Sequence, residues 1–151
     1  MAQIAKMEVQ IEIKSSADKF YDIFRSKMHL MPKICPQNFK DGKLVEGDWN
    51  SVGSVRLWFY FAAGNSETVK ETTEAIDDKS KTMTFNMLEG DMMKYYKSFK
   101  GILNVTALGQ GSLVKWTMEY EKQNEGIPDP IKYEDFLRSW SNNVDGYLLN
   151  A

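Results

Sequence analysis

The chain has 151 residues, a length that is ample for one globular domain with its own core, and we expect residues 1–151 to form a single domain. Charged residues make up 26% of the chain and the net charge is −2, which argues against a nucleic-acid-binding protein, because such proteins usually carry a basic surface. The single cysteine, Cys35, excludes an internal disulfide bond and makes the cytoplasm the expected location.

The N-terminal segment predicts a half-buried strand. Over residues 6–14 apolar and polar side chains alternate, with Val9, Ile11 and Ile13 on one face, which is the period of a strand that buries one side. The strand follows the first residues directly, so we expect no signal peptide. No apolar run in the chain approaches the roughly 20 residues of a membrane-spanning helix, so we expect no membrane span.

Two short helices and a series of strands are predicted next. Ser15 or Ser16 can cap a helix over residues 17–26, and Pro32 limits a second helix over residues 28–34. Glycine, asparagine and aspartate then separate apolar segments at intervals of about a dozen residues, as in an antiparallel meander. The predicted strands cover residues 39–46, 53–61, 66–76, 81–88, 94–108 and 113–123.

The last segment predicts a long helix over residues 129–149. Asp129 can cap it, and Pro130 suits its first turn. It is the one predicted element long enough to cover the buried face of the strands. Its wide apolar stripe consists of Tyr133, Phe136, Leu137, Trp140, Val144, Tyr147 and Leu148.

The composition is compatible with an internal cavity. Aromatic residues make up 13% of the chain and there are nine methionines, whose flexible thioethers fill irregular spaces and adapt to varied ligands. A solid core explains the same composition equally well. Composition alone therefore leaves both interpretations open.

Four segments in this order resemble the major latex protein branch of the birch-pollen-allergen-like, or START-like, superfamily. They are residues 20–25, 45–55, 89–99 and 114–122. The resemblance implies an α+β fold in which a curved seven-stranded antiparallel sheet wraps around a long C-terminal helix, with two short helices after the first strand and an internal hydrophobic cavity. It also implies binding of sterols, fatty acids, flavonoids or hormones, with a role in plant defence or stress, and some relatives are enzymes of alkaloid or terpenoid pathways.

Alternation and resemblance disagree about which face of residues 53–61 is buried. Alternation favours Val55, Leu57 and Phe59, because arginine is costly to bury. The resemblance implies that Arg56 points inward instead, next to Glu71 on the following strand. We follow the resemblance for the strand face. Arg56 and Glu71 then form either a buried pair at the polar end of the pocket or a solvated surface pair, and we give these two interpretations equal weight.

The same conflict arises in residues 94–108. Alternation places Phe99 and Leu103 inward, whereas the resemblance implies Lys100 and Ile102. We again follow the resemblance, although a solvated Lys100 is favoured about two to one.

The predicted ligand-binding residues come from the inward faces of the strands and from the helices that border the mouth. In chain order they are Phe24, Met28, Met31, Arg56, Trp58, Tyr60, Glu71, Met83, Phe85, Met87, Ile102, Trp116, Met118, Tyr120, Phe136 and Trp140. We expect them to enclose a pocket of about 300–1,000 Å³. His29 is the only histidine and there is no cysteine cluster, so we expect no metal site, and nothing in the sequence calls for a cofactor.

The first functional hypothesis is a binding or carrier protein for small hydrophobic metabolites. The second is a cofactor-free cyclase or isomerase, with Glu71, Tyr60, Tyr120 or Lys100 as the acid–base group. The third is a signalling protein that contacts a partner through the loop over residues 46–53. That loop lacks the Gly-Lys-Ser/Thr ending of a phosphate-binding loop and is expected to be a tight hairpin. We expect a monomer or weak dimer.

Overall fold

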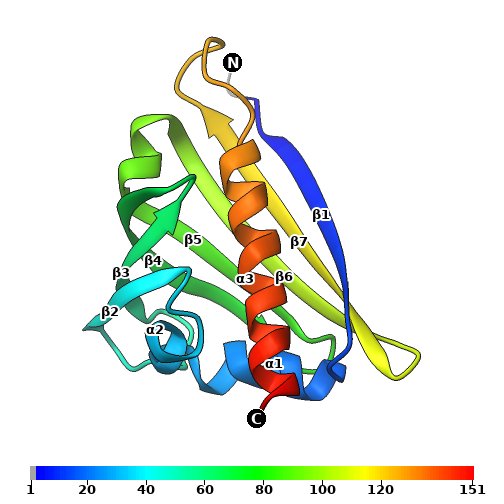
Figure 1. The fold of residues 1–151 in the computed structure, drawn as a ribbon. Coiled ribbons are helices and arrows are strands. Elements are labelled where there is room, and N and C mark those ends of the chain that lie inside the picture. The colour runs from blue at the N-terminus through cyan, green and yellow to red at the C-terminus, as the bar shows by residue number, and fades with distance from the viewer. Residues whose placement is uncertain (1–2) are drawn as a thin grey trace.

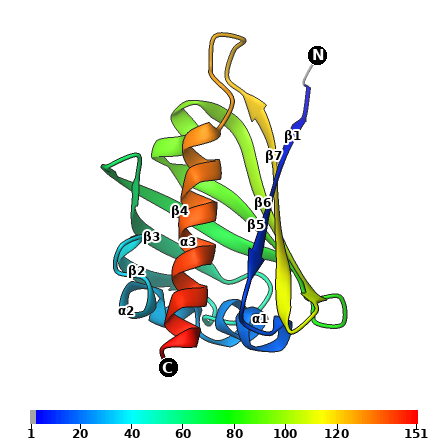
Figure 2. The same cartoon turned by 45° about the vertical axis from the view of Figure 1, so that its right-hand side comes forward.

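A computed structural model describes residues 3–151 of the chain. In this part of the chain seven strands form one curved antiparallel sheet, and a long C-terminal helix lies along its concave face (Figures 1 and 2). The strands are β1 (Ala5–Ile13), β2 (Phe39–Glu46), β3 (Val55–Ala62), β4 (Asn65–Asp77), β5 (Thr82–Gly90), β6 (Tyr96–Leu108) and β7 (Gly111–Lys122). The helices are α1 (Ala17–Ser26), α2 (Met31–Ile34) and α3 (Ile131–Leu149), with two 3₁₀ turns, η1 (Met28–Leu30) and η2 (Asp91–Lys94).

The strand order is β1-β7-β6-β5-β4-β3-β2. Strands β2 to β7 form a meander in which each strand pairs with the next, and β1 joins the far edge by pairing with β7, from Ala5 opposite Tyr120 to Ile13 opposite Ser112. Helices α1 and α2 link β1 to β2 at one end of the sheet (Figure 1). The predicted fold class is confirmed. The expectation about the start of the chain rests partly on residues 1–2, which lie outside the described residues.

The first helix begins as predicted, and the second differs in detail. The Ser16 side chain accepts a hydrogen bond from the Lys19 amide at 3.3 Å and so caps α1. The helix predicted over residues 28–34 is divided into η1 and α2, because Pro32 has no N–H to continue a helical ladder from Met28. The Met31 amide donates to the Met28 carbonyl instead and closes a tighter turn.

Helix α3 buries most of its predicted stripe, with Tyr133 and Val144 among its buried residues, but Tyr147 is exposed. The predicted cap is wrong. The Asp129 carboxylate lies 2.8 Å from the Lys122 ammonium and is not bonded to the first turn of the helix. A charged lysine on the neighbouring strand provides a stronger partner than a helix amide.

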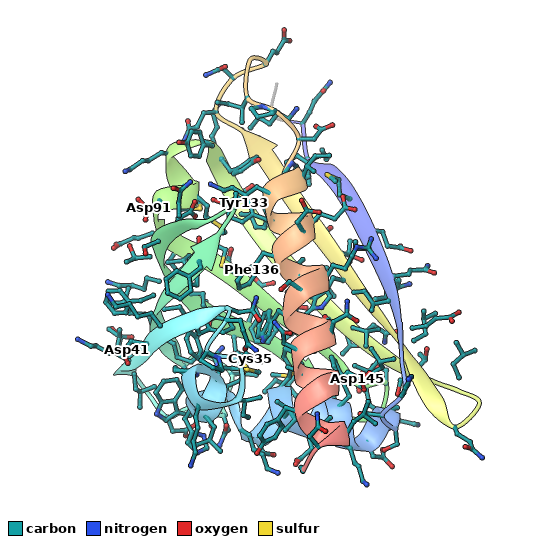
Figure 3. All side chains as sticks on the ribbon, viewed as in Figure 1. Cys35, Asp41, Asp91, Tyr133, Phe136 and Asp145 are labelled. Carbon is teal, nitrogen blue, oxygen red and sulfur yellow. The ribbon has the colours of Figure 1, made fainter. Side chains whose placement is uncertain are left out.

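Near its other end, α3 is anchored by the buried Asp145 (Figure 3). The Asp145 carboxylate accepts hydrogen bonds from the Lys14 amide at 3.1 Å, the Ser15 amide at 2.9 Å and the Ser15 hydroxyl at 2.6 Å. These bonds join α3 to the turn between β1 and α1. They also satisfy backbone groups that would otherwise be unpaired at a buried turn.

The strand faces follow the resemblance in β3 and contradict it in β6. In β3 the buried residues are Arg56, Trp58 and Tyr60, as the resemblance implied. In β6 they are Phe99, Leu103 and Val105, as alternation predicted.

The prediction that Lys100 and Ile102 point inward is therefore wrong. The reason is a shift of pairing register between β6 and β7 at Tyr96 and Ser98. Because side chains alternate with a period of two, such an irregularity reverses which residues of the strand face inward from that point on. Tyr96 is buried before the shift, and Phe99 is buried after it.

Candidate ligand-binding cavity

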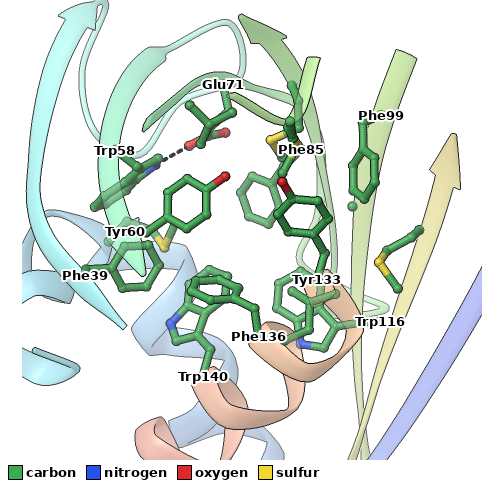
Figure 4. Close-up of a pocket in the computed structure, with 17 residues that line it drawn as sticks. Phe39, Trp58, Tyr60, Glu71, Phe85, Phe99, Trp116, Tyr133, Phe136 and Trp140 are labelled. Atoms are coloured by element: carbon green, nitrogen blue, oxygen red, sulfur yellow. Dashed lines mark hydrogen bonds between the residues drawn. The ribbon is translucent and has the colours of Figure 1, made fainter. Parts of the chain in front are cut away.

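A cavity of about 90 Å³ lies between the concave face of the sheet and α3 (Figure 4). Its wall is apolar and consists mainly of aromatic rings and methionines. The lining residues are Met28, Phe39, Trp58, Tyr60, Val69, Glu71, Phe85, Met87, Met92, Phe99, Gly101, Trp116, Met118, Tyr133, Phe136, Leu137 and Trp140. The predicted pocket of about 300–1,000 Å³ is larger than this space. The rings of Tyr133, Phe136 and Trp140 project from α3 toward the sheet and occupy part of the difference.

The structure brings most of the predicted ligand-binding residues to this wall. They are Met28, Trp58, Tyr60, Glu71, Phe85, Met87, Trp116, Met118, Phe136 and Trp140. Others form a layer directly behind it. The Phe24 ring lies 4.9 Å from the Trp140 ring between centroids, and the Met31 sulfur accepts a hydrogen bond from the Trp140 indole at 3.3 Å. Met83 and Arg56 are also buried without lining the cavity.

Two predicted residues lie away from the cavity. Ile102 is on the outer face of β6, for the reason given above. Tyr120 is buried, but its hydroxyl is directed toward Asp129, 3.5 Å away.

Several lining residues were not predicted, and most of them had a signal in the sequence. Tyr133 and Leu137 belong to the apolar stripe of the last helix, and Phe99 follows from alternation in β6. Gly101 had no signal. Its position matters because a side chain there would point into the cavity, with the nearest atom of Trp116 4.0 Å from a Cβ.

A buried ion pair stands behind one end of the cavity. The Arg56 and Glu71 side chains are 1% and 4% exposed, and Arg56 Nε lies 2.7 Å from Glu71 Oε1. Arg56 Nη2 also donates to Glu71 Oε2 at 3.1 Å and to the Thr73 hydroxyl at 2.5 Å, while Nη1 donates to the Trp49 carbonyl at 3.1 Å. The Trp58 indole donates to Glu71 Oε1 at 2.8 Å (Figure 4). Both carboxylate oxygens of Glu71 are therefore engaged by the protein.

A second buried carboxylate, Glu67, ties two cavity tyrosines to α3. The Tyr60 and Tyr133 hydroxyls donate to Glu67 Oε1 at 2.7 and 2.8 Å, and the Lys132 ammonium pairs with Oε2. Burial, together with this carboxylate, raises the pKa of both tyrosines well above the ordinary value. Sequence reasoning missed this cluster, although the alternation that places Val69 and Glu71 inward extends to Glu67.

The remaining polar groups of the wall are also paired within the protein. The Trp116 indole donates to the Ser141 hydroxyl at 2.9 Å, and the Trp140 indole donates to Met31 as described. Each indole and phenol donor of the lining residues thus has a protein acceptor. The cavity offers shape and apolar contact and leaves no hydrogen-bond donor free at its wall.

The four candidate catalytic groups do not converge on the cavity. Lys100 is on the outer face of β6, where its ammonium lies 2.9 Å from Glu74 Oε1, and both side chains are substantially exposed. Tyr120 is directed elsewhere, and the polar atoms of Tyr60 and Glu71 are already engaged.

Among residues 3–151, no group of three or more histidine, cysteine, aspartate or glutamate side chains is arranged to hold a metal ion. Burial raises the pKa of the Cys35 thiol to about 12, which makes it a poor nucleophile.

The loop between β2 and β3 is folded onto the core. The Asp48 carboxylate accepts hydrogen bonds from the Asn50 amide and the Ser51 hydroxyl, both at 2.8 Å, and closes the turn. Trp49 is half-buried, and its ring lies 5.8 Å from that of Trp58. Trp49 therefore packs against the core, while the other residues of the loop are exposed, and a partner contact through this loop stays a prediction.

Comparison with known proteins identifies the family. Residues 2–151 match the model of the pathogenesis-related protein Bet v 1 family. The chain belongs to this family. It is 41% identical over 145 residues to MLP-like protein 34 of Arabidopsis thaliana, a match that covers 95% of the chain and 46% of that protein. It is 40% identical over 147 residues to MLP-like protein 31 of the same plant, covering 96% of the chain and 86% of that protein. The chain thus spans less than half the length of some of its relatives.

Solved structures of other proteins have the same fold. The crystal structure of ginseng major latex-like protein 151 from Panax ginseng superposes with a TM-score of 0.91 at 37% identity, covering 95% of this chain and 97% of that one. Norcoclaurine synthase from Thalictrum flavum, in complex with dopamine and hydroxybenzaldehyde, superposes with a TM-score of 0.83 at 18% identity, covering 99% and 88%. The second likeness concerns the fold alone. Of the helices in residues 3–151, none has the length and apolar character needed to cross a membrane.

Proposed function

We propose that this protein binds and carries small hydrophobic metabolites in the cavity beneath α3. The observation that carries the proposal is an apolar cavity whose wall has its polar groups paired within the protein. Burial of apolar surface, at about 25 cal/mol per Å², supplies the binding free energy in such a site. Membership of the family and the likeness to major latex-like proteins support the same function.

The size of the cavity limits what can bind without rearrangement. A space of about 90 Å³ is smaller than a sterol or a long fatty acid requires. Larger guests need the lining to move, and methionines are the side chains best suited to do so. Met28, Met87, Met92 and Met118 all line the cavity.

The enzymatic alternative has less support. Cyclisation or isomerisation needs an acid–base group within reach of the substrate. The candidate groups point away from the cavity or are held by protein partners. We further propose that residues 1–151 form a single domain and that the protein is a monomer or weak dimer. We also propose that it is located in the cytoplasm and has a role in plant defence.

A test of the proposal is to fill the cavity without removing any existing contact. Gly101 has no side chain, and a Cβ at this position would meet only the Trp116 ring, at 4.0 Å, so Gly101→Val should occupy the cavity and favour the strand. We expect the variant to fold and to lose binding of a hydrophobic guest such as p-xylene by at least about tenfold. Titration followed by heteronuclear NMR measures the affinity.

The matched control is Thr106→Val, which places a valine on the exposed face of the same strand. Its affinity should equal that of the wild type. Unchanged affinity in a folded Gly101→Val variant would show that the guest binds elsewhere and would refute the proposal.

A further inference from the structure

We infer that the cavity selects neutral guests that lack a hydrogen-bonding head group, so that ring-sized hydrocarbons are preferred over acids, amines and alcohols of the same shape. The inference rests on the proposed function and specifies the chemical class of its ligand. It follows from how the polar atoms around the cavity are used, together with the size of the space.

The donors at the wall are already engaged. The indoles of Trp58, Trp116 and Trp140 donate to Glu71, Ser141 and Met31. The hydroxyls of Tyr60 and Tyr133 both donate to Glu67. A carboxylate or carbonyl entering the cavity would lose its hydration and find no free donor among the lining groups. Burial of such a group is strongly unfavourable.

The charges near the wall disfavour ionic guests of either sign. A carboxylate would lie close to the Glu71 carboxylate, which is a like charge. An ammonium could only reach Glu71 by competing with Arg56, which is held there by further bonds to Thr73 and the Trp49 carbonyl. Glu67 is similarly engaged by Lys132 and the two tyrosines.

The size of the space points to compact molecules. A dry apolar cavity of about 150 Å³ in another protein holds benzene or xenon. The cavity described above is somewhat smaller, at about 90 Å³, and has flexible methionines in its wall. A guest no larger than about a single ring therefore requires the least rearrangement.

The test compares guests of nearly equal shape. p-Xylene and p-cresol differ by one methyl group exchanged for a hydroxyl, while p-toluate and benzylammonium add a negative and a positive charge near neutral pH. Affinities for the intact protein are measured by NMR titration, with the signals of the Trp58 and Trp116 indole protons as reporters of the cavity. We expect p-xylene to bind, p-cresol to bind at least about tenfold more weakly, and the two ions not to saturate.

The outcomes separate the inference from the proposed function. Binding of p-cresol or either ion as tight as that of p-xylene overturns the inference and leaves the carrier function standing. Failure of p-xylene and of xenon to bind at all overturns both. p-Xylene binding with the expected order supports both.

A variant makes the inference sharper. In Trp58→Phe, Glu71 Oε1 loses the indole bond and keeps its contact with Arg56 Nε, so one acceptor position of this oxygen becomes free beside the cavity. The ratio of p-cresol to p-xylene affinity should rise by at least about fivefold. In the matched variant Trp116→Phe, the lost indole bond frees a serine hydroxyl rather than a carboxylate, so the ratio should change less. An unchanged ratio in a folded Trp58→Phe protein contradicts the inference, and if that variant fails to fold, the wild-type comparison still decides.

Discussion

The two walls of the cavity differ in whether they bury charged side chains. The wall formed by β3 and β4 buries an arginine and two glutamates, Arg56, Glu67 and Glu71. The wall formed by β6 and β7 buries apolar side chains such as Leu103 and Trp116, and places its lysines outside. The difference shows that the charges buried in this fold have an oppositely charged partner inside the protein, Glu71 on the neighbouring strand for Arg56 and Lys132 of α3 for Glu67. Arg56 lies directly opposite Glu71 in the sheet, whereas Lys100 finds its acidic partner, Glu74, on the outer face.

The strongest way to break this comparison is to remove one member of the buried pair. Glu71→Leu leaves the Arg56 charge unpaired in the interior, and should lower the free energy of unfolding by about 3–5 kcal/mol. Urea denaturation measures the loss. The double variant Arg56→Met/Glu71→Leu should recover most of it, because no charge then remains buried. A loss below about 1 kcal/mol in the single variant would mean that the pair is not buried as described.

Alkaline pH should weaken the same wall to an intermediate degree. Tyr60 and Tyr133 have pKa values raised above the unfolded value of about 10, so the folded state holds these protons more tightly than the unfolded state. Their contribution is complete below about pH 10 and is lost as the pH rises toward the folded pKa values, by about 1.4 kcal/mol per tyrosine and pH unit.

The measurement is the free energy of unfolding across that range, for the wild type and for Tyr60→Phe. Above about pH 10, the free energy of unfolding should fall less steeply with pH in Tyr60→Phe than in the wild type, because one tyrosine no longer contributes. Equal slopes in the wild type and Tyr60→Phe would contradict the raised pKa.

The smallest effect is expected on the outer face. The Lys100 and Glu74 side chains are 38% and 41% exposed. Exposed ion pairs contribute about 0–1 kcal/mol, so Lys100→Met should change the free energy of unfolding by less than about 1 kcal/mol. The same variant should leave p-xylene affinity unchanged. A large loss of stability or of p-xylene affinity in this variant would make Lys100 a candidate site residue again.

The sequence was most informative where alternation and the resemblance agreed. In β5 and β7 both placed Phe85, Trp116 and Met118 inward, and these residues line the cavity. In β3 alternation favoured the opposite face, because hydrophobicity alone cannot register the partner that a buried arginine finds on the next strand. The resemblance was needed there, and the structure agrees with it.

Other features were beyond reach for identifiable reasons. The register shift at Tyr96 was beyond the resemblance, which implied the wrong face of β6, whereas alternation predicted the right one. The Glu67 cluster joins β3, β4 and α3, so it depends on three segments meeting in space. The volume of the cavity is the small difference between the space that the sheet encloses and the side chains that fill it, and composition cannot supply such a difference.

The fastening of α3 at two points has a kinetic consequence. Lys132 and Tyr133, near its first turn, are held by Glu67, and Asp145, near its last turn, is held by the Ser15 region. A helix secured in this way does not lift as a whole, so a guest enters and leaves when one fastening opens transiently. Residence time would then depend on the frequency of that opening as well as on contacts with the walls.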